Sequence, residues 1–255
     1  MRREIVTLAV VALLVVAGCS SGGGDTTTTP AYDTEAEPVY ETPLDTETVT
    51  DAHVDALRDH GTFTVDVNAT WRHGSSERVR REILVRGNLD TGAVYEHQAA
   101  RGDVQQTYRF GNGTAYARFV SSGEVSYDSV TRGVGNATTY ASGNLWGALE
   151  LFTFDYAGTR AVDGERVHVY RADSLDRSGE FDPSNLGGGE NVTVNRAEAT
   201  LQFREDGTLR HADYTLQFES DGESQLTSVD LHVQRLGDTD VSPPRWIPDA
   251  RNATE

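Results

Sequence analysis

The sequence predicts a mainly β domain in which an antiparallel sheet is combined with two short helices. Apolar and polar side chains alternate with a period of two from Phe63 to Trp71, which is the pattern of a half-buried strand. Asp206-Gly207 and Asp221-Gly222 separate the last alternating segments, as the turns of β-hairpins do. Two other segments, 50–61 and 144–154, carry apolar residues at helical spacing.

Each expected element follows from a local pattern. The first helix has Thr50 as its predicted N-cap and ends at Gly61. After the strand at 62–71, strands are predicted over 77–88, 93–100, 104–110, 114–120, 160–172, 192–204, 209–220 and 224–236. Asp163-Gly164 is either a hairpin turn or the lead-in to a strand, and the stretch between 120 and 144 has no regular pattern.

The chain divides into four predicted parts. Residues 1–18 form a signal peptide, 19–48 a lipidated disordered tether, 49–248 the β domain and 249–255 a flexible tail. The tether is rich in glycine, threonine and acidic residues, so it cannot bury enough apolar area to offset its chain entropy. Prolines between 243 and 248 end the domain, because proline cannot donate a hydrogen bond within a central strand.

Cys19, the sole cysteine, predicts where the protein is located. A basic start precedes an apolar run, Ile5 to Ala17, that is too short to cross a bilayer as a helix, which is typical of an export signal. Val16-Ala17-Gly18-Cys19 resembles a lipobox, whose cysteine is lipidated once the signal is removed. We therefore expect a lipid anchor at Cys19 on the extracellular face of the cell membrane. An ordinary secretory signal with an incidental cysteine is the alternative, and the export route, general secretory or twin-arginine, stays open.

The charge balance excludes several classes of function. The chain has no lysine, and its 22 arginines stand against 40 acidic residues, for a net charge of −18. This balance resembles that of proteins from extreme halophiles, in which salt near 1 M shortens the Debye length to about 3 Å. Without a basic stripe, nucleic-acid binding is not expected. Without lysine, Schiff-base chemistry and a Walker-type phosphate loop are excluded.

Five Asn-x-Thr sequons indicate an extracytoplasmic, glycosylated surface. They begin at Asn68, Asn112, Asn136, Asn191 and Asn252. The same tripeptides also mark turns in threonine-rich β proteins, and Asn112 fits that alternative best.

The predicted sheet has more apolar area than its helices can cover. Eight or nine strands spaced by about 4.8 Å make a sheet about 40 Å wide. Two helices, each about 10 Å across, cover about half of that width. The rest must curl on itself, meet a partner chain or enclose an apolar ligand. The candidates for lining such a hollow are Trp71, Tyr108, Phe110, Trp146, Leu149 and Phe152, and an ordinary core position is the alternative for each.

The order of these elements resembles the LolA-type half-barrel, the fold of the lipoprotein carrier LolA and of the mycobacterial lipoproteins LppX and LprG. The resemblance spans 49–248 and implies a curved antiparallel half-barrel sheet of about eight to ten strands, with two short helices against the concave face and acyl chains bound between. Glu205-Asp206-Gly207-Thr208-Leu209 and Pro244-Arg245-Trp246 also resemble a haloarchaeal lipoprotein family of unknown function.

Catalytic motifs are missing from the sequence. It has no Gly-x-Ser-x-Gly elbow, no His-Glu-x-x-His and no glycine fingerprint that opens a helix. His168, His211 and His232 fall in late strands and would have to converge to hold a metal. We expect no enzyme activity, no cofactor and no metal. The densest basic cluster comprises Arg78, Arg80 and Arg81; it is either a strand face paired with acids or a contact for anionic lipid head groups.

These observations predict a membrane-anchored extracytoplasmic lipoprotein that binds a lipid-like or apolar ligand without catalysis. Water exclusion would favour an acyl chain by about 0.8 kcal/mol for each buried methylene. The alternative is a surface glycoprotein interaction module whose apolar face binds an unidentified partner protein.

Overall fold

The computed structural model describes residues 32–76, 78–130, 133–175, 192–220 and 222–254, which belong to one compact unit. The predicted signal peptide, Cys19, the first part of the tether and Asn191 lie outside these residues. The prediction of a disordered tether is wrong for its second part: the Asp33 backbone pairs with Thr159, and the Tyr40 backbone hydrogen-bonds the Tyr170 hydroxyl, so this part packs against the β domain. The helices are α1 (Thr46–His60), α2 (Ala137–Leu151) and α3 (Ile247–Thr254). The strands are β1 (Thr62–His73), β2 (Val79–Asn88), β3 (Val94–Ala100), β4 (Asp103–Arg109), β5 (Ala115–Ser121), β6 (Glu124–Val130), β7 (Asp155–Val162), β8 (Glu165–Ala172), β9 (Val192–Arg204), β10 (Leu209–Ser220) and β11 (Glu223–Gln234).

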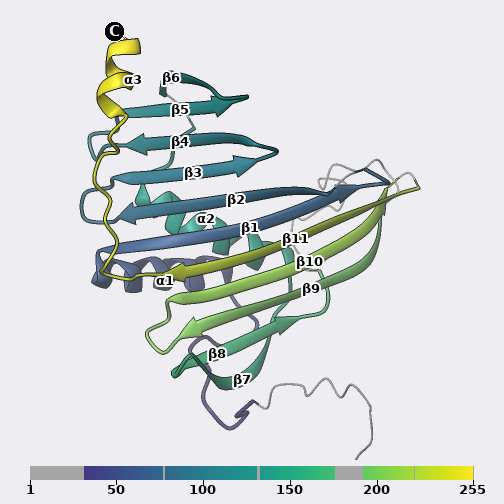
Figure 1. The fold of residues 1–255 in the computed structure, drawn as a ribbon. Coiled ribbons are helices and arrows are strands. Elements are labelled where there is room, and N and C mark those ends of the chain that lie inside the picture. The colour runs from purple at the N-terminus through teal and green to yellow at the C-terminus, as the bar shows by residue number, and fades with distance from the viewer. Residues whose placement is uncertain (1–31, 77, 131–132, 176–191, 221, 255) are drawn as a thin grey trace, which may run out of the picture. The chain divides into compact units, whose positions relative to one another are not determined.

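The strands form one 11-stranded sheet in the order β6-β5-β4-β3-β2-β1-β11-β10-β9-β8-β7. Hairpins lead outward from β1 to the β6 edge, α2 crosses to the β7 edge, and hairpins return to β11 (Figure 1). The first and last strands of the sheet therefore pair at its centre, where Val65 lies opposite Val233. The predicted fold class, mainly β with a curved open antiparallel sheet, is confirmed, with 11 strands and a third helix.

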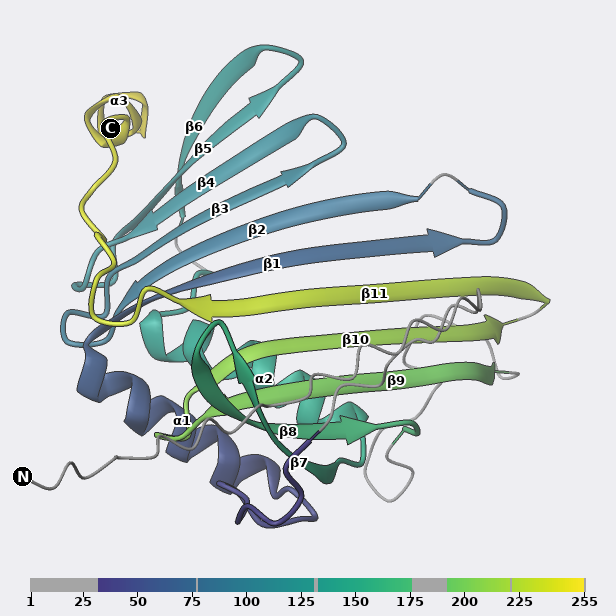
Figure 2. The ribbon, with the colours of Figure 1, turned by 60° about the horizontal axis from the view of Figure 1, so that its bottom comes forward.

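The concave face of the sheet carries α1 and α2 (Figure 2). Side chains alternate between the faces of a strand, so Phe63, Val65 and Val67 of β1 all point to the same side. All three are buried and belong to a core cluster that also contains Leu57 of α1 and Leu145 of α2. Burial of this concave face is the main source of stability in the domain.

Helix α1 begins earlier than the sequence predicted. Asp45 is its N-cap and accepts a hydrogen bond from the Thr48 N–H at 2.8 Å, whereas Thr50 lies buried within the helix. The helix ends at Gly61, as expected, with φ 76°, where the Gly61 N–H donates to the carbonyls of Leu57 and Arg58. A proline or a β-branched residue is disfavoured at that φ.

Helix α2 also begins before its predicted range of 144–154. Asn136 is its N-cap, and the following first turns contain threonine, serine and glycine, which are poor helix formers. Packing compensates for this, because Ala137 and Ala141 are buried in the core cluster. The sequence pattern detected only the half of the helix that carries large apolar side chains.

The sequence pattern does not predict β6, and it merges β7 with β8. Strand β6 lies in the stretch predicted as irregular; it is an edge strand with mostly exposed polar side chains and therefore has no apolar alternation. The range 160–172 contains the end of β7 and all of β8, and Asp163-Gly164 is the hairpin turn between them. Both turn residues have positive φ, 53° and 82°, as a two-residue turn between twisted strands requires.

The C-terminal segment, residues 235–254, crosses the outer face of the sheet after β11 and ends in α3 (Figure 1). Thr239 hydrogen-bonds Thr64 at 2.8 Å between the two hydroxyl oxygens, and the Tyr108 hydroxyl donates to the Val241 carbonyl at 3.0 Å. Ile247 is buried, because α3 packs against β5 and β6. The prediction of a flexible tail over 249–255 is corrected by this helix. Pro248 is the second residue of α3, and proline is tolerated there because an N–H at a helix start has no intrahelical acceptor.

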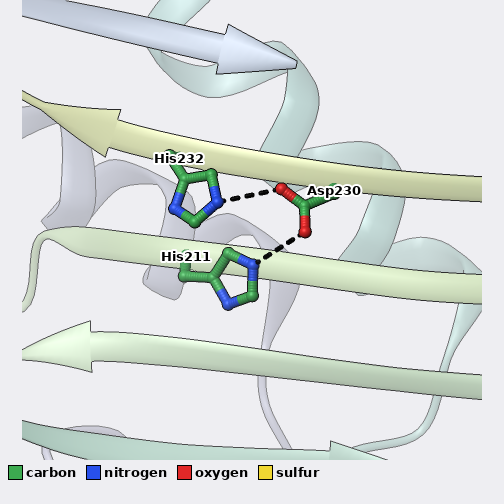
Figure 3. A group of neighbouring side chains, drawn as sticks. All are labelled: His211, Asp230 and His232. Carbon is green, nitrogen blue, oxygen red and sulfur yellow. Dashed lines mark ion pairs between the residues drawn. The ribbon is translucent and has the colours of Figure 1, made fainter. Parts of the chain in front are cut away.

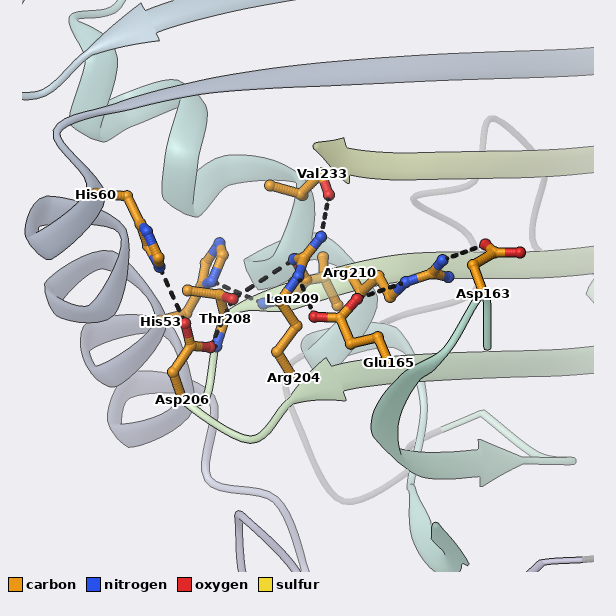
Figure 4. Close-up of polar contacts among 10 residues, drawn as sticks. All are labelled: His53, His60, Asp163, Glu165, Arg204, Asp206, Thr208, Leu209, Arg210 and Val233. Carbon is orange, nitrogen blue, oxygen red and sulfur yellow. Dashed lines mark hydrogen bonds and ion pairs between the residues drawn. The ribbon is translucent and has the colours of Figure 1, made fainter. Parts of the chain in front are cut away.

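A polar cluster centred on Arg204 joins the ends of β8, β9, β10 and β11 (Figure 4). Its guanidinium pairs with Glu165 at 3.0 Å and donates to the carbonyl oxygens of Leu209 and Val233 at 2.8 and 2.9 Å. Burial lowers the pKa of Arg204, and the Glu165 carboxylate opposes that shift. Three charge-assisted contacts satisfy this half-buried cation.

His53 of α1 connects both inner helices to the sheet. Its Nδ1 accepts a hydrogen bond from the Leu209 N–H at 3.1 Å, and the ring also hydrogen-bonds the Ala141 backbone of α2. The side chain is buried, and this burial lowers the pKa of His53 to about 4. The imidazole is therefore neutral in the folded protein at neutral pH.

Candidate ligand-binding surface

The register of the sheet places one row of side chains across four strands on the concave face. Arg81 of β2 lies opposite Ala69 of β1, Ala69 lies opposite Val229 of β11, and Val229 lies opposite Tyr214 of β10. Trp71 is two residues beyond Ala69 and therefore shares its face. All five are exposed or partly exposed. We call Ala69, Trp71, Arg81, Tyr214 and Val229 the distal concave patch.

Helix α2 borders this patch and exposes one large apolar side chain, Trp146. The Phe152 ring, directly after the helix, lies 5.7 Å from the Tyr214 ring. Glu150 is the only charged residue of α2, although the chain as a whole is rich in charge. Trp146 is 40% exposed on this helix. The exposed positions of α2 among the described side chains are Thr139, Gly143, Trp146 and Glu150, so its outward side is mixed and adds apolar area mainly through Trp146.

The patch combines apolar area with two polar functions. The Arg81 guanidinium lies 5.3 Å from the centre of the Trp71 ring, within the range of a cation–π interaction. Burial raises the pKa of Tyr214, so its hydroxyl stays protonated. Among the residues that the structure describes, this hydroxyl has no hydrogen-bond partner. The patch therefore offers a cation and a free hydroxyl beside apolar side chains.

Glu96 is a buried acid on this face, and two side chains hydrogen-bond its carboxylate. Its carboxylate accepts from the Tyr140 hydroxyl at 2.8 Å and from the Gln98 amide at 2.6 Å. Burial and the Glu96 charge both raise the pKa of Tyr140. The contact ties α2 to β3 and marks the polar boundary of the concave core.

The six residues predicted to line a hollow occupy three different surroundings. Tyr108 and Phe110 lie on the outer face, where their rings meet edge to face at 4.8 Å and the C-terminal segment covers them. Leu149 and Phe152 lie in the closed core beneath α2. Trp71 and Trp146 are exposed or partly exposed on the concave side. The structure therefore does not bring the six together.

Sequence reasoning missed Arg81 and Tyr214 as members of the concave surface. The sequence groups Arg81 with Arg78 and Arg80 as one basic cluster, but neighbouring strand residues point to opposite faces. Arg80 accordingly pairs with Asn68 and Glu82 on the outer face. The alternation itself was readable from the sequence, whereas the pairing of β1 with β11 that adds Tyr214 was not.

The outer face has a groove beneath the C-terminal segment. Its volume is about 360 Å³, and it is lined by Arg86 and Tyr95 from the sheet and by Trp246 from the segment, among others. Trp246 stacks against Tyr127 of β6 with ring centres 6.4 Å apart. This groove is separate from the distal concave patch, because it lies on the other side of the sheet.

Two of the three late-strand histidines converge on the outer face. His211 of β10 and His232 of β11 are opposite each other, with their rings stacked 4.4 Å apart (Figure 3). Asp230 pairs with both rings, at 2.9 Å from His232 and 3.5 Å from His211. His168 instead lies on the concave side, stacked against Tyr156.

Four of the five sequons fall within the described residues. Asn112, Asn136 and Asn252 are exposed, whereas Asn68 is partly buried in the centre of β1. Asn112 and Asn136 each accept a backbone hydrogen bond through Oδ1, in a turn and at a helix N-cap. Glycans attach at Nδ2, so these structural roles are compatible with the predicted modification.

Together, these features define the class of the protein: an open antiparallel half-barrel with helices packed in its concavity and an incompletely covered concave face. Residues 4–250 match DUF7537, a family of unknown function, and the chain belongs to that family. Among proteins of curated function, no significant sequence relative was found.

Several solved structures are similar to this chain. The lipoprotein LppX of Mycobacterium tuberculosis is 12% identical, with a TM-score of 0.32 over 77% of this chain and 98% of that one. LprF of Mycobacterium bovis is 13% identical, with a TM-score of 0.36 over 78% and 96%. A LolA superfamily protein of Nitrosomonas europaea is 12% identical, with a TM-score of 0.28 over 78% and 98%. Because these TM-scores are below 0.5, the architecture given above rests on the strand order of this chain's own sheet and not on these similarities.

None of the described helices is long and apolar enough to cross a membrane.

Proposed function

We propose that this protein binds a lipid-like amphiphile on the distal concave patch, without catalysis, at the extracytoplasmic face of the membrane. The observation that carries the proposal is the composition of the patch. An apolar strip formed by Ala69, Trp71 and Val229 ends at Arg81 on one side and on the other at the Tyr214 hydroxyl, which has no hydrogen-bond partner among the described residues.

The net charge of the chain makes an arginine without an acidic partner, such as Arg81, a candidate for binding an anionic group. In a protein with a net charge of −18, an exposed arginine without a carboxylate partner among the described residues is available for an anionic group. Arg81 also lies over an aromatic ring, which orients the guanidinium at the edge of the apolar strip. This arrangement suits a molecule with an acyl chain and an acidic head group.

The expected location rests on the sequence. The lipobox-like Val16-Ala17-Gly18-Cys19 supports a lipid anchor at Cys19, and the tether after it would hold the β domain clear of the membrane. Changing Cys19 to Ser should release the protein from membranes into the soluble fraction. Unchanged fractionation with membranes would contradict the anchor and leave ligand binding to be judged separately.

The three tryptophans provide the test of binding. Trp71 and Trp146 belong to the concave side, and Trp246 packs on the outer face. A brominated fatty acid quenches the fluorescence of a tryptophan that it touches, so the wild-type protein should be quenched in a saturable way. Trp71→Phe should remove most of the quenching, and Trp246→Phe, the matched control, should leave it intact.

Head-group recognition is tested by comparing ligands of equal chain length. Arg81→Gln should weaken binding of a fatty acid about fivefold, the scale of a partly exposed ion pair, and should leave binding of the corresponding fatty alcohol unchanged. Absence of saturable quenching, together with no co-purifying lipid in native mass spectrometry, would overturn the proposal. A stable homodimer or protein complex that protects Trp71 would instead support the interaction-module alternative.

A further inference from the structure

We propose that His211, Asp230 and His232 form a binding site for a divalent transition-metal ion on the outer face of the sheet, and that Zn²⁺ is the ion that suits this donor set. Their ligand atoms all lie within 4.8 Å of one another (Figure 3). Two imidazoles and one carboxylate are ligands that zinc accepts, with the fourth tetrahedral position left for water.

The sheet register places the three groups rigidly. His211 and His232 are direct cross-strand partners on β10 and β11, and Asp230 is two residues from His232 on the same face. The carboxylate lies between the rings, with one oxygen 2.9 Å from Nε2 of His232 and the other 3.5 Å from Nε2 of His211. Both Nε2 atoms therefore face the same carboxylate.

The hydrogen bonding of His211 is incomplete without a further ligand. Its Nε2 is buried and forms no hydrogen bond with any described residue, since the 3.5 Å contact with Asp230 is too long. Its Nδ1 lies 3.0 Å from the side-chain amide of Gln202 on β9, and the Oε1 of that amide is also buried without a partner in the described part of the chain. Two neighbouring buried polar atoms without partners are unusual in a folded protein.

A metal ion between His211, Asp230 and His232 would give the buried Nε2 of His211 a partner. The two ends of a glutamine amide are assigned from the hydrogen-bond network, so Gln202 can equally present Oε1 to the ring. Nδ1–H of His211 then donates to Gln202, and Nε2 directs a lone pair toward the Asp230 carboxylate. A lone pair facing an anion is unfavourable unless a cation lies between them. A glutamine carbonyl behind the ring would take the role that a carboxylate, a backbone carbonyl or water has for most metal-ligating histidines.

The surrounding charges favour a cation. Asp213 lies opposite Asp230 on β10, and Asp66 lies opposite His232 on β1. Among the described residues, none of these three carboxylates forms an ion pair with an arginine, in contrast to Asp163 and Glu165, which pair with Arg210 at 2.6 and 3.1 Å.

The test is a calorimetric titration of the untagged full-length protein with ZnCl₂ at about 1 M KCl, where weak attraction to the acidic surface is screened. One ion should bind per chain. His232→Gln and Asp230→Asn, both at exposed positions, should weaken binding by about 100-fold or more, since even supporting residues around a metal contribute 10–100-fold. Gln202→Leu should weaken it by about 10-fold.

His73→Gln is the matched control. His73 pairs with Glu223 at 3.0 Å and is similarly exposed, but it has no second histidine beside it among the described residues. This variant should bind Zn²⁺ as the wild type does. Co²⁺ should give the visible absorption of a tetrahedral complex, and the band should disappear in His232→Gln. Absence of a one-to-one site, or equal loss of binding in His73→Gln and His232→Gln, would overturn the proposal.

Discussion

The two halves of the sheet bury their aromatic side chains on opposite faces. In the β7–β11 half, Tyr170, Phe203 and Phe218 point to the concave side and are buried against the helix-bearing core. In the β3–β6 half, Tyr108 and Tyr127 point to the outer side, where the C-terminal segment covers them. Alternation along a strand decides which residues share a face, but the covering element decides on which face the large rings are buried.

This comparison also explains where the distal concave patch lies. Helices α1 and α2 fill the concavity next to β1, β2 and β10, and no third helix continues this cover along the concave face of the described residues. Helix α3 packs on the other side, against β5 and β6. The apolar strip beyond α2 is therefore left partly open, and the outer face of the β3–β6 half is closed.

The largest expected effect on stability comes from comparing a ring buried on the concave face with a ring packed on the outer face. Phe203→Ala should lower the free energy of unfolding by about 3–5 kcal/mol, because the ring is fully buried and contacts Tyr170 and Tyr40 at 5.6 and 5.0 Å. Tyr127→Ala on the β6 edge should cost about 1 kcal/mol, since this ring is only partly buried. Urea unfolding measures both. Equal losses would show that the outer core matters as much as the concave one.

Acid should weaken the concave core through His53. Its pKa is about 4 in the fold and near 6.5 when unfolded, so the unfolded chain takes up the proton first. Stability is complete above pH 6.5 and falls by about 3 kcal/mol as the pH decreases to 4. Chemical unfolding across this range measures the slope. His53→Gln should flatten it, and the exposed His73→Gln should not; an unchanged slope in His53→Gln would contradict the assignment.

Gly87 tests how tightly the concave core is filled. A Cβ built at this position would lie 2.4 Å from the Phe63 ring, directly across from it on β1. Gly87→Ala should therefore cost about 1–3 kcal/mol. The double variant with Phe63→Leu should recover part of that loss relative to Phe63→Leu alone. Strictly additive losses in the double-mutant cycle would argue against the clash.

The smallest expected effect concerns the open side of α2. A Cβ at Gly143 meets no atom within 4 Å, and alanine is a better helix former than glycine. Gly143→Ala should raise the free energy of unfolding by about 0.5–1 kcal/mol, read as a higher thermal midpoint. A clear destabilisation would mean that this side of α2 is packed against another part of the protein.

Individual elements show why sequence reasoning succeeded in part. The β1 alternation and the Asp-Gly hairpins depend on neighbouring residues, so they were readable and their strands are confirmed. Strand β6 and the first half of α2 lack large periodic apolar residues and are stabilised by pairing and packing. Trp71 is among the residues predicted to line a hollow, and alternation along β2 is enough to separate Arg81 from Arg80, whereas Tyr214 joins the patch only through the pairing of β1 with β11 and of β11 with β10.

The sequence by itself determined the period-two faces of the strands, the end of α1 at Gly61 and the acidic charge, because each follows from composition or from residues close together in the chain. Export and lipidation at Cys19 stay predictions from the same kind of local pattern. The tertiary structure decided that β1 pairs with β11, on which face each half of the sheet buries its aromatic side chains, and that His211, Asp230 and His232 meet. These features arise from contacts between distant residues, and no local pattern encodes which distant strand becomes a neighbour.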